Sequence, residues 1–527
     1  MQLRLRFSVD KKDFVGYVYR SGRFDFFLPK IYKNHIKEES SKNIKDAKLK
    51  SIVESLPWWI YRVLDQYMKQ KGKSEVNKKE IYDIRSSKID NKNYEPSIIE
   101  RILSLKDFYD NNRDLFLFIY KQTHSGFNRI NWSRTVRKYN PIINNGKVVY
   151  LNVDNHKKFI NYDEQLLVIF FNTLIYLNDE MGLPVVVDQP YNLYGKDEFK
   201  RMIENGQVLG KLRRIRNNYF NDKLRLLWEL LYAYYCADFK LREDKQYEEY
   251  LYTTSFENVF EGIMDYMLSD VDLITEKNQN ERIIDHLFAG ESIFGEADKV
   301  CYIADSKYYR INSEVGENSN LKQFSYARNL ITQAMENKIS KGCKDFDEKF
   351  KNIAQKYRDD KTEGYVVTPN FYVRPNENVG FAEDEFELFP FENEGVKVKR
   401  HFDGRLFDRD TLFLMQYTVN LLYVMQCYAK NDIIERNRFR SKVETKVACD
   451  LNEHIKNNGI KVFRRWFSTE NELDDFIGSH FRSLIGRMFS RDNCLIVALA
   501  ESDDKLKEFT DNLEWEPHLF FVEQIDS

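Results

Sequence analysis

A carboxylate and an ammonium group stand two residues apart in an apolar segment near the middle of the chain. In the stretch YIADSKYY, Ser306 alone separates Asp305 from Lys307. Alternate residues of a β-strand project from the same face, so a strand here would present both charges to one site and turn Ser306 away. The apolar flanks are typical of a central strand that holds two charges at its exposed end.

The D-x-K spacing is weak evidence by itself, because it recurs elsewhere in the chain. Triplets of the form (D/E)xK begin at many other positions, among them Asp10, Asp347, Asp359 and Asp503. These four stand in runs of charged residues, which are typical of a solvated surface. Of the five, only the triplet at Asp305 has apolar residues on both sides, and we take it as the candidate site.

A second carboxylate precedes this strand. Asp285 follows the apolar pair 283–284, twenty residues before Asp305, on what we expect to be the neighbouring strand. Two carboxylates on neighbouring strands form a hard-oxygen site suited to Mg²⁺. Asp298 is closer in sequence, but its surroundings indicate a loop, so it is the second choice. His286 would face away from Asp285, as a hydrogen-bonded structural histidine or as a catalytic group.

Two predicted helices flank the carboxylates. Upstream, Glu257, Glu261 and Asp265 recur every four residues and form an acidic ridge that could lend one carboxylate to a metal. Downstream, the helix LKQFSYARNLI carries Gln323 and Tyr326 three residues apart, hence on one face. Alone, the glutamine would be a surface residue and the tyrosine a core aromatic, so their value is positional.

The order of these motifs resembles that of the PD-(D/E)XK nuclease superfamily, including its RecB-like branch. The motifs are, in sequence, a glutamate-bearing helix, an Asp, a (D/E)xK triplet and a helix with Q-x-x-Y. Ile284 stands where the family has proline before the first Asp. More narrowly, these motifs, with HFDGRLFDRDTLFLMQY and the segment NRINWSRTV at 128–136, resemble the LlaJI-type restriction endonucleases, relatives of the McrC nuclease subunit. The resemblance covers roughly residues 110–430.

The resemblance implies a mixed α/β multidomain chain with a PD-(D/E)XK core, acting as a Mg²⁺-dependent DNA endonuclease in restriction or phage defence, with Mn²⁺ as a substitute. It implies double-stranded DNA as the substrate and an McrB-like AAA+ GTPase as a partner. The chain has no Walker A pattern, so any motor would be another chain. The implied roles are metal ligands (Asp285, Asp305, the Ser306 carbonyl, and Glu261 or Glu257), orientation of the attacking water (Lys307), and support of the site or contact with DNA (Gln323, Tyr326).

The length of 527 residues predicts two to four domains. We expect a small β unit with a helical linker region (1–95), a mainly helical region that binds DNA or a partner (96–244), the nuclease domain (245–430) and a small mixed C-terminal domain (431–527). The first forty residues predict a β-hairpin. The apolar segment 411–429 predicts a buried helix.

Bulk charge leaves nucleic-acid binding open, because the net charge is only -2. One local basic cluster could track a phosphate backbone. It comprises Lys211, Arg213, Arg214 and Arg216, interspersed with apolar residues and followed by two aromatic residues. A solvated helix face is an equally good interpretation.

The six cysteines include no CxxC pair and match neither a disulfide framework nor a zinc site, which favours reduced thiols in a cytoplasm. The resemblance to restriction enzymes implies that this cytoplasm is prokaryotic. No apolar run predicts a membrane span. Two other functions remain open: a repair or recombination nuclease of the same superfamily, and a non-catalytic DNA-binding or assembly subunit that keeps the fold. The oligomeric state is also open.

Overall fold

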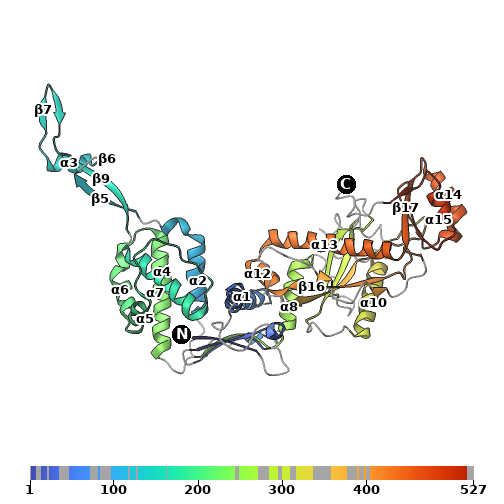
Figure 1. Cartoon of the computed structure of the whole chain (residues 1–527), viewed down its shortest axis with the longest axis horizontal. Coiled ribbons are helices and arrows are strands. Elements are labelled where there is room, and N and C mark those ends of the chain that lie inside the picture. Colours follow the sequence, from blue (N-terminus) through green and yellow to red (C-terminus); the bar gives the residue numbers. More distant parts are fainter. Residues whose placement is uncertain are drawn as a thin grey trace.

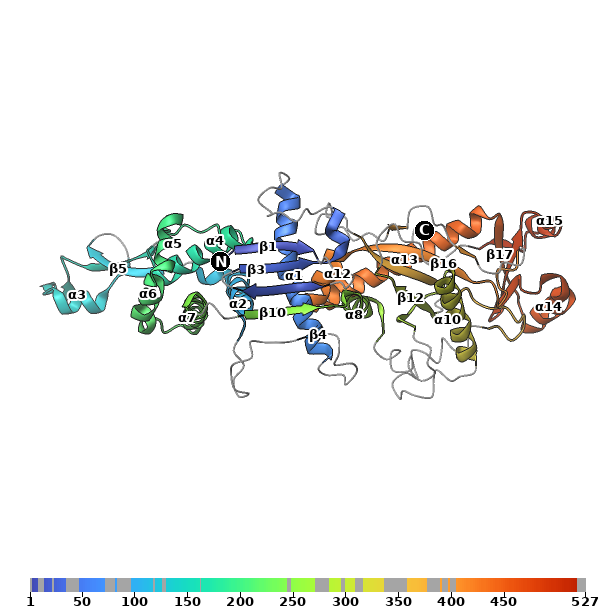
Figure 2. The ribbon, with the colours of Figure 1, turned by 90° about the horizontal axis from the view of Figure 1, so that it is seen from below.

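The chain is elongated, with a helical body and projecting arm at one end and a small mixed unit at the other (Figures 1 and 2). This computed structural model describes residues 2–7, 14–20, 23–34, 47–71, 81–82, 96–116, 119–125, 129–161, 163–243, 248–270, 284–294, 299–308, 316–335, 358–376, 389–390, 397–398 and 404–518. Helices alternate with both parallel and antiparallel sheets, which confirms the predicted mixed α/β multidomain class. Among the described residues, no helix combines the length and apolarity needed to cross a bilayer.

The N-terminal sheet has the strand order β1-β3-β2-β10-β4. Its strands are β1 (Gln2–Phe7), β2 (Val15–Arg20), β3 (Arg23–Leu28), β4 (Ile81–Tyr82) and β10 (Glu248–Thr253). The predicted hairpin is confirmed, because β2 and β3 pair antiparallel. On the core side, helix α1 (Ala47–Lys71) contacts β2, β3 and β10.

Strand β10 corrects the predicted boundary at residue 245, which would assign this segment to the nuclease domain. It pairs antiparallel with β2 instead. Its exposed and buried residues alternate, so one face packs on the N-terminal core. There the Tyr17 hydroxyl donates a 2.5 Å hydrogen bond to the Glu249 carboxylate. The other domain boundaries stay predictions.

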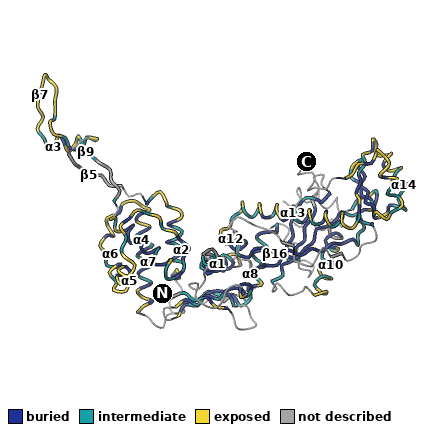
Figure 3. The backbone as a smooth tube through the Cα atoms, viewed as in Figure 1, coloured by how far each residue is buried: buried dark blue, intermediate teal, exposed yellow. Residues whose placement is uncertain are grey.

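The region after residue 96 is mainly helical, and a β arm projects from it between α2 and α4 (Figure 1). Ser97 and Glu100 form a capping box that starts α2. Much of the distal arm is exposed, whereas α4 is buried along most of its length (Figure 3). The body comprises α2 (Ile98–Asn111), α4 (Gln165–Met181), α5 (Lys196–Glu204), α6 (Gln207–Ile215) and α7 (Asp222–Glu243); the arm comprises β5 (Ile119–Ser125), β6 (Arg129–Ile130), α3 (Trp132–Lys138), β7 (Ile142–Asn144), β8 (Lys147–Val149) and β9 (Asp154–Ile160).

The central sheet has the strand order β11-β12-β13-β16-β14, and β15 also pairs with β16. Strands β12, β13 and β16 are parallel, whereas β11 runs antiparallel to β12. The strands are β11 (His286–Glu291), β12 (Lys299–Ser306), β13 (Asn370–Asn376), β14 (Phe389–Pro390), β15 (Lys397–Val398) and β16 (Phe413–Asn420).

Strand β16 corrects a second prediction, that segment 411–429 forms one buried helix. Residues Phe413–Asn420 form a strand that is buried on both faces, and only Leu421–Lys430 form a helix, α12. The Asn420 side chain accepts a hydrogen bond from the Tyr423 backbone and caps this helix. A central parallel strand shows the same continuous apolar pattern as a buried helix, because neighbours cover both of its faces.

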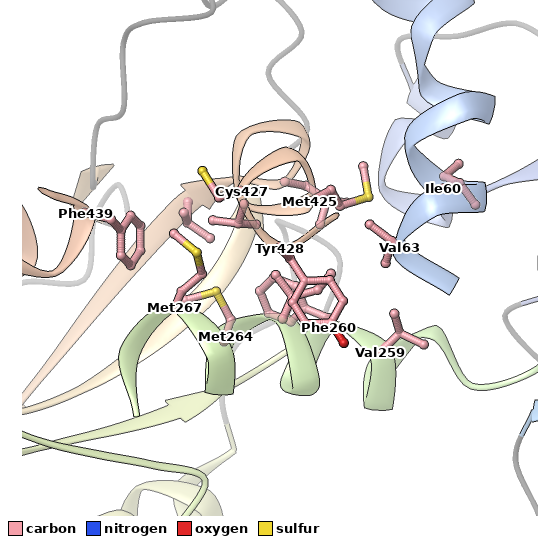
Figure 4. Packing of buried hydrophobic residues seen from close by; sticks show 14 of the residues in the cluster. Ile60, Val63, Val259, Phe260, Met264, Met267, Met425, Cys427, Tyr428 and Phe439 are labelled. Carbon is pink, nitrogen blue, oxygen red and sulfur yellow. The ribbon is translucent and has the colours of Figure 1, made fainter. Parts of the chain in front are cut away.

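Helix α8 (Phe256–Leu268) is held between α1, α12 and α13 (Ile433–Asn457) by closely packed apolar side chains (Figure 4). Each such buried side chain contributes about 1.5–3 kcal/mol relative to exposure. This packing fixes the helix that covers one face of β11 and β12. The side chains labelled in Figure 4 are Ile60, Val63, Val259, Phe260, Met264, Met267, Met425, Cys427, Tyr428 and Phe439.

The C-terminal unit starts with α13 and has a small core of its own, which includes Phe463, Leu473 and Trp515. Two arginines of α13 bind the end of α8. Arg440 donates to both carboxylate oxygens of Asp270, at 2.5 and 2.7 Å, and Arg436 donates to the Ser269 carbonyl at 2.7 Å. The elements are α13 (Ile433–Asn457), β17 (Ile460–Trp466), α14 (Glu470–Leu484), β18 (Met488–Arg491), β19 (Cys494–Ala500), α15 (Leu506–Thr510) and β20 (Glu516–Pro517).

The close approach of β2 to β10 depends on Gly16, so Gly16→Ala should destabilise the N-terminal sheet by about 1–3 kcal/mol. Gly16 has φ +138°, and an added Cβ would lie 2.2 Å from the Leu251 carbonyl oxygen. Hydrogen exchange of the β2 and β10 amides and the midpoint of thermal unfolding would measure the loss. Gly210→Ala is the matched control, because its Cβ would meet nothing within 4 Å. Equal stability of the two variants would contradict the prediction.

Candidate active site

The ends of β11 and β12 bring two carboxylates together. The antiparallel register pairs His286 with Ala304, so Asp285, just before β11, lies beside Asp305 near the end of β12. The Ser306 backbone N–H donates to Asp285 Oδ2 at 3.3 Å. Asp305 is buried, with 7% of its surface exposed.

Lys307 lies on the same side of the sheet as Asp305. Its Nζ is 2.7 Å from Asp305 Oδ1 and 5.7 Å from the centre of the Tyr372 ring. Its backbone N–H donates to the Val373 carbonyl at 2.9 Å, which extends the pairing of β12 with β13 by one residue. The structure therefore brings Asp285, Asp305 and Lys307 together, while their catalytic roles stay predictions.

The buried Asp305 carboxylate lies beside the half-buried Asp285. Burial raises the pKa of Asp305 to about 8, with further increases from a side-chain hydrogen bond and the charge of Asp285, against the opposing effect of Lys307. Burial and the charges of both aspartates also raise the pKa of Tyr326, which lies close enough to sense them. Either a proton or a cation would relieve the repulsion between the carboxylates.

Helix α10 (Glu317–Met335) covers the face of the sheet that carries the carboxylates. Gln323 is buried and donates to Asn370 Oδ1 at 2.8 Å, which docks the helix on the start of β13. Asn370 pairs with Ile303, two residues before Asp305 and hence on the same face. Half-buried Tyr326 lines a hollow of about 590 Å³ on this helix. The functional roles of the Q-x-x-Y pair stay predictions.

Helix α8 covers the opposite face. Tyr308, which alternates away from Lys307, packs against Phe256 and Phe260 of α8 at ring-centroid distances of 5.5 and 5.9 Å. Glu257 is exposed and Glu261 is half-buried on this helix, and their roles as metal ligands stay predictions.

The carboxylate pair fits a magnesium ion. Within the described part of the chain, no group of three or more His, Cys, Asp or Glu side chains could hold a metal. Magnesium does not need such a group, because it usually takes one or two protein carboxylates and keeps several waters. Structural zinc, which takes four protein ligands, fits poorly. Asp298, the alternative first ligand, lies outside the described residues.

The predicted basic cluster lies on α6 and the following turn, in the helical body at the far end of the chain from β12 (Figure 2). Arg213, Arg214 and Arg216 are exposed, whereas Lys211 donates to the Tyr194 hydroxyl at 2.7 Å. The Arg216 guanidinium lies 5.7 Å from the centre of the Trp228 ring. The cluster therefore combines exposed guanidinium groups with aromatic surface, and its DNA-binding role stays a prediction.

Sequence reasoning missed two features near the site. Asp265, which was expected only as part of an acidic ridge, hydrogen-bonds to His286 on the back of the sheet. Arg374 of β13 is 1% exposed and donates to Gln416 Oε1 at 3.1 Å, on the face that carries Asp305. A lone arginine in the apolar strand NFYVRPN was the only signal for this buried charge.

No family model matches the chain, and no curated protein matches it. Among solved structures, the chain is similar to one from Thermococcus gammatolerans, described as a refined half-complex from the tetradecameric assembly of McrB AAA+ hexamers with bound McrC. The match has 12% identity, covers 82% of each chain and has a TM-score of 0.23. Because this TM-score is so low, functional conclusions rest on the site itself.

The raised pKa of Asp305 predicts a pH dependence of stability without metal. The folded chain holds this proton more tightly than the unfolded chain, whose Asp pKa is about 3.9. The Asp305 contribution to the free energy of unfolding is therefore fully present below about pH 4. It should be lost as the pH rises towards 8, by at most about 1.4 kcal/mol per pH unit.

Asp285→Asn should flatten this fall, because it removes the charge that helps to raise the pKa of Asp305. Denaturant unfolding in EDTA, repeated across this pH range, would measure it. Asp504→Asn, at an exposed aspartate, is the control. A slope in Asp285→Asn as steep as in the wild type would count against the coupling.

Proposed function

We propose that the chain is a Mg²⁺-dependent DNA endonuclease of the PD-(D/E)XK type that acts in restriction or phage defence in a prokaryotic cytoplasm. The observation that carries this proposal is the convergence of Asp285, Asp305 and Lys307 at one end of two adjacent strands. The order of the motifs along the sequence supports the same function.

The residues of the site divide the chemistry between them. Asp285 and Asp305 would hold Mg²⁺, which would supply Lewis-acid activation of the scissile phosphate and of a bound water. The Lys307 ammonium, 2.7 Å from Asp305, would orient the attacking water and offset the negative charge that develops on phosphorus. Half-buried Tyr326 of α10, which lies close to both carboxylates, would contact the DNA backbone.

A non-catalytic DNA-binding or assembly subunit is the rival from another class. Burial of Asp305 beside Asp285 argues against it, because placing two acids together in a low dielectric costs stability that folding alone does not require. A repair or recombination nuclease of the same superfamily would use the same chemistry. It would require DNA ends or junctions, whereas the proposed enzyme cuts closed circles.

An McrB-like AAA+ GTPase is the proposed partner, on the strength of the sequence resemblance. The arm offers a surface for protein contact, because several large apolar side chains lie on it in solvent. The most exposed are Val136 (57%), Ile143 (75%), Val148 (62%) and Leu151 (76%).

Plasmid cleavage tests the proposed activity. Wild type with Mg²⁺ should linearise closed circular DNA, and EDTA should abolish cutting. Asp305→Ala and Lys307→Ala should each lower the rate at least about 100-fold, because each removes charge stabilisation that the reaction requires. Asp504→Ala is the matched control, because Asp504 is the exposed middle residue of another D-x-K triplet. Equal cutting by all variants would remove the catalytic assignment.

The same assay tests the partner. If wild type alone is silent, adding an McrB-like AAA+ protein from the same genome, with GTP or with ATP, should start cleavage that Asp305→Ala lacks. Silence under every condition, with intact DNA binding, would favour the non-catalytic subunit.

The basic cluster predicts a salt-dependent contribution to DNA affinity. Arg214→Glu with Arg216→Glu should weaken binding and reduce the dependence of log K on log salt, by about 0.9 for each lost phosphate contact. Fluorescence anisotropy at several salt concentrations would measure both. Arg482→Glu, at an exposed arginine of α14, is the control for added negative charge. An unchanged slope in the double variant would mean a merely solvated helix face.

A further inference from the structure

Three polar side chains, linked by hydrogen bonds, join α8 to the back of β11 and β12. Asp265 Oδ1 is 3.0 Å from His286 Nδ1, and His286 Nε2 is 2.6 Å from Ser306 Oγ. The His286 side chain is completely buried, and Ser306 is 8% exposed. Buried polar groups with good hydrogen bonds define a single arrangement, because any other arrangement would leave a partner unsatisfied.

These residues have the order of a serine-hydrolase triad but not its access. A nucleophilic serine must reach a bound substrate, with the histidine at its side. Here the three side chains lie between the sheet and α8, and Tyr308 packs on that helix beside them. The geometry therefore leaves no place for a substrate and favours a positioning role.

These three side chains meet the sheet at the point where the backbone pairing of β11 with β12 ends. The last registered pair of β11 and β12 is His286 with Ala304, so no further backbone pair sets the position of Asp285 against Asp305. The His286 side chain reaches one step beyond this pair to Ser306, on the back of the sheet. On the front, the N–H of the same Ser306 donates to Asp285 Oδ2.

Asp265, the member of the three farthest from the carboxylates, is anchored to the rest of the molecule. Ser269 Oγ donates to Asp265 Oδ1 at 2.7 Å, and the Ser269 carbonyl accepts from Arg436 of α13 at 2.7 Å. Helix α8 itself is packed between α1 and α12 (Figure 4). A rigid support on the back of the sheet thus reaches the residue between Asp305 and Lys307.

We propose that Asp265, His286 and Ser306 form a positioning relay that fixes the separation of the Asp285 and Asp305 carboxylates and thereby sets the affinity of the site for a divalent cation. The relay rests on the proposed function, because it supports the same metal site. Residues that orient metal ligands from behind typically change metal affinity by 10- to 100-fold when they are replaced.

Direct metal binding tests the relay without any need for cleavage. Mn²⁺ titration of the full chain, followed by calorimetry or by loss of the free-ion electron paramagnetic resonance signal, gives the affinity. Ser306→Ala removes only the hydroxyl and keeps the backbone N–H and carbonyl, so it is the least disruptive variant. We expect about tenfold weaker binding for Ser306→Ala and for His286→Ala.

Two comparisons separate positioning from general stability. Thr173→Val removes a buried hydroxyl that bonds to Tyr235 at 2.6 Å in the helical body, and it should leave Mn²⁺ affinity unchanged. The double variant of Ser306→Ala with His286→Ala should bind no more weakly than His286→Ala alone, because both changes break one relay. Circular dichroism confirms that each variant is folded, and if His286→Ala is not, Ser306→Ala alone decides.

The outcomes distinguish the two proposals. Wild-type affinity in folded Ser306→Ala and His286→Ala would overturn the relay and leave the nuclease proposal intact. Equal losses in Thr173→Val would also overturn it, because the effect would then be general. A wild type that binds no Mn²⁺ and cuts no DNA would overturn the proposed function itself, and the relay with it.

Discussion

The proximity of two carboxylates at a buried strand end is the constraint on which the site depends. Burial and the charge of Asp285 raise the pKa of Asp305, and Lys307 offsets only part of this increase. A protein can keep such a pair only if the surrounding fold is stable enough to impose it. The pair therefore favours the binding of positive charge. A proton on Asp305 supplies this charge at low pH, and a divalent cation would supply it at high pH.

The two faces of the central sheet have different roles around this pair of carboxylates. Alternation along β12 sends Asp305 and Lys307 to the face under α10, and it sends Ser306 and Tyr308 to the face under α8. Both helices pack through buried apolar side chains, α8 against α1 and α12, and α10 is also tied to β13 by the Gln323–Asn370 hydrogen bond. The chemistry on the front thus has a separate mechanical support at the back.

The remaining regions extend the molecule far beyond this sheet. The helical body carries exposed guanidinium groups, and the arm carries exposed apolar side chains, at the opposite end from the C-terminal unit (Figure 1). Under the proposed function, this separation would place contacts with DNA or a partner away from the candidate active site. The N-terminal sheet joins the two ends, because β10 enters it directly after the helical body and directly before α8.

The sequence by itself determined the local pattern: period-two alternation put Asp305 and Lys307 on one face of a strand, and a spacing of three residues put Gln323 and Tyr326 on one face of a helix. It also predicted the hairpin of β2 with β3. Tertiary structure decided what depends on distant neighbours. Phe413–Asn420 became a strand that is buried on both faces, β10 joined a strand more than 200 residues away in the sequence, and Asp265 of α8 met His286 on the back of the central sheet. Local periodicity reports which side of an element is apolar, but the identity of the partner on that side is set only when the chain closes.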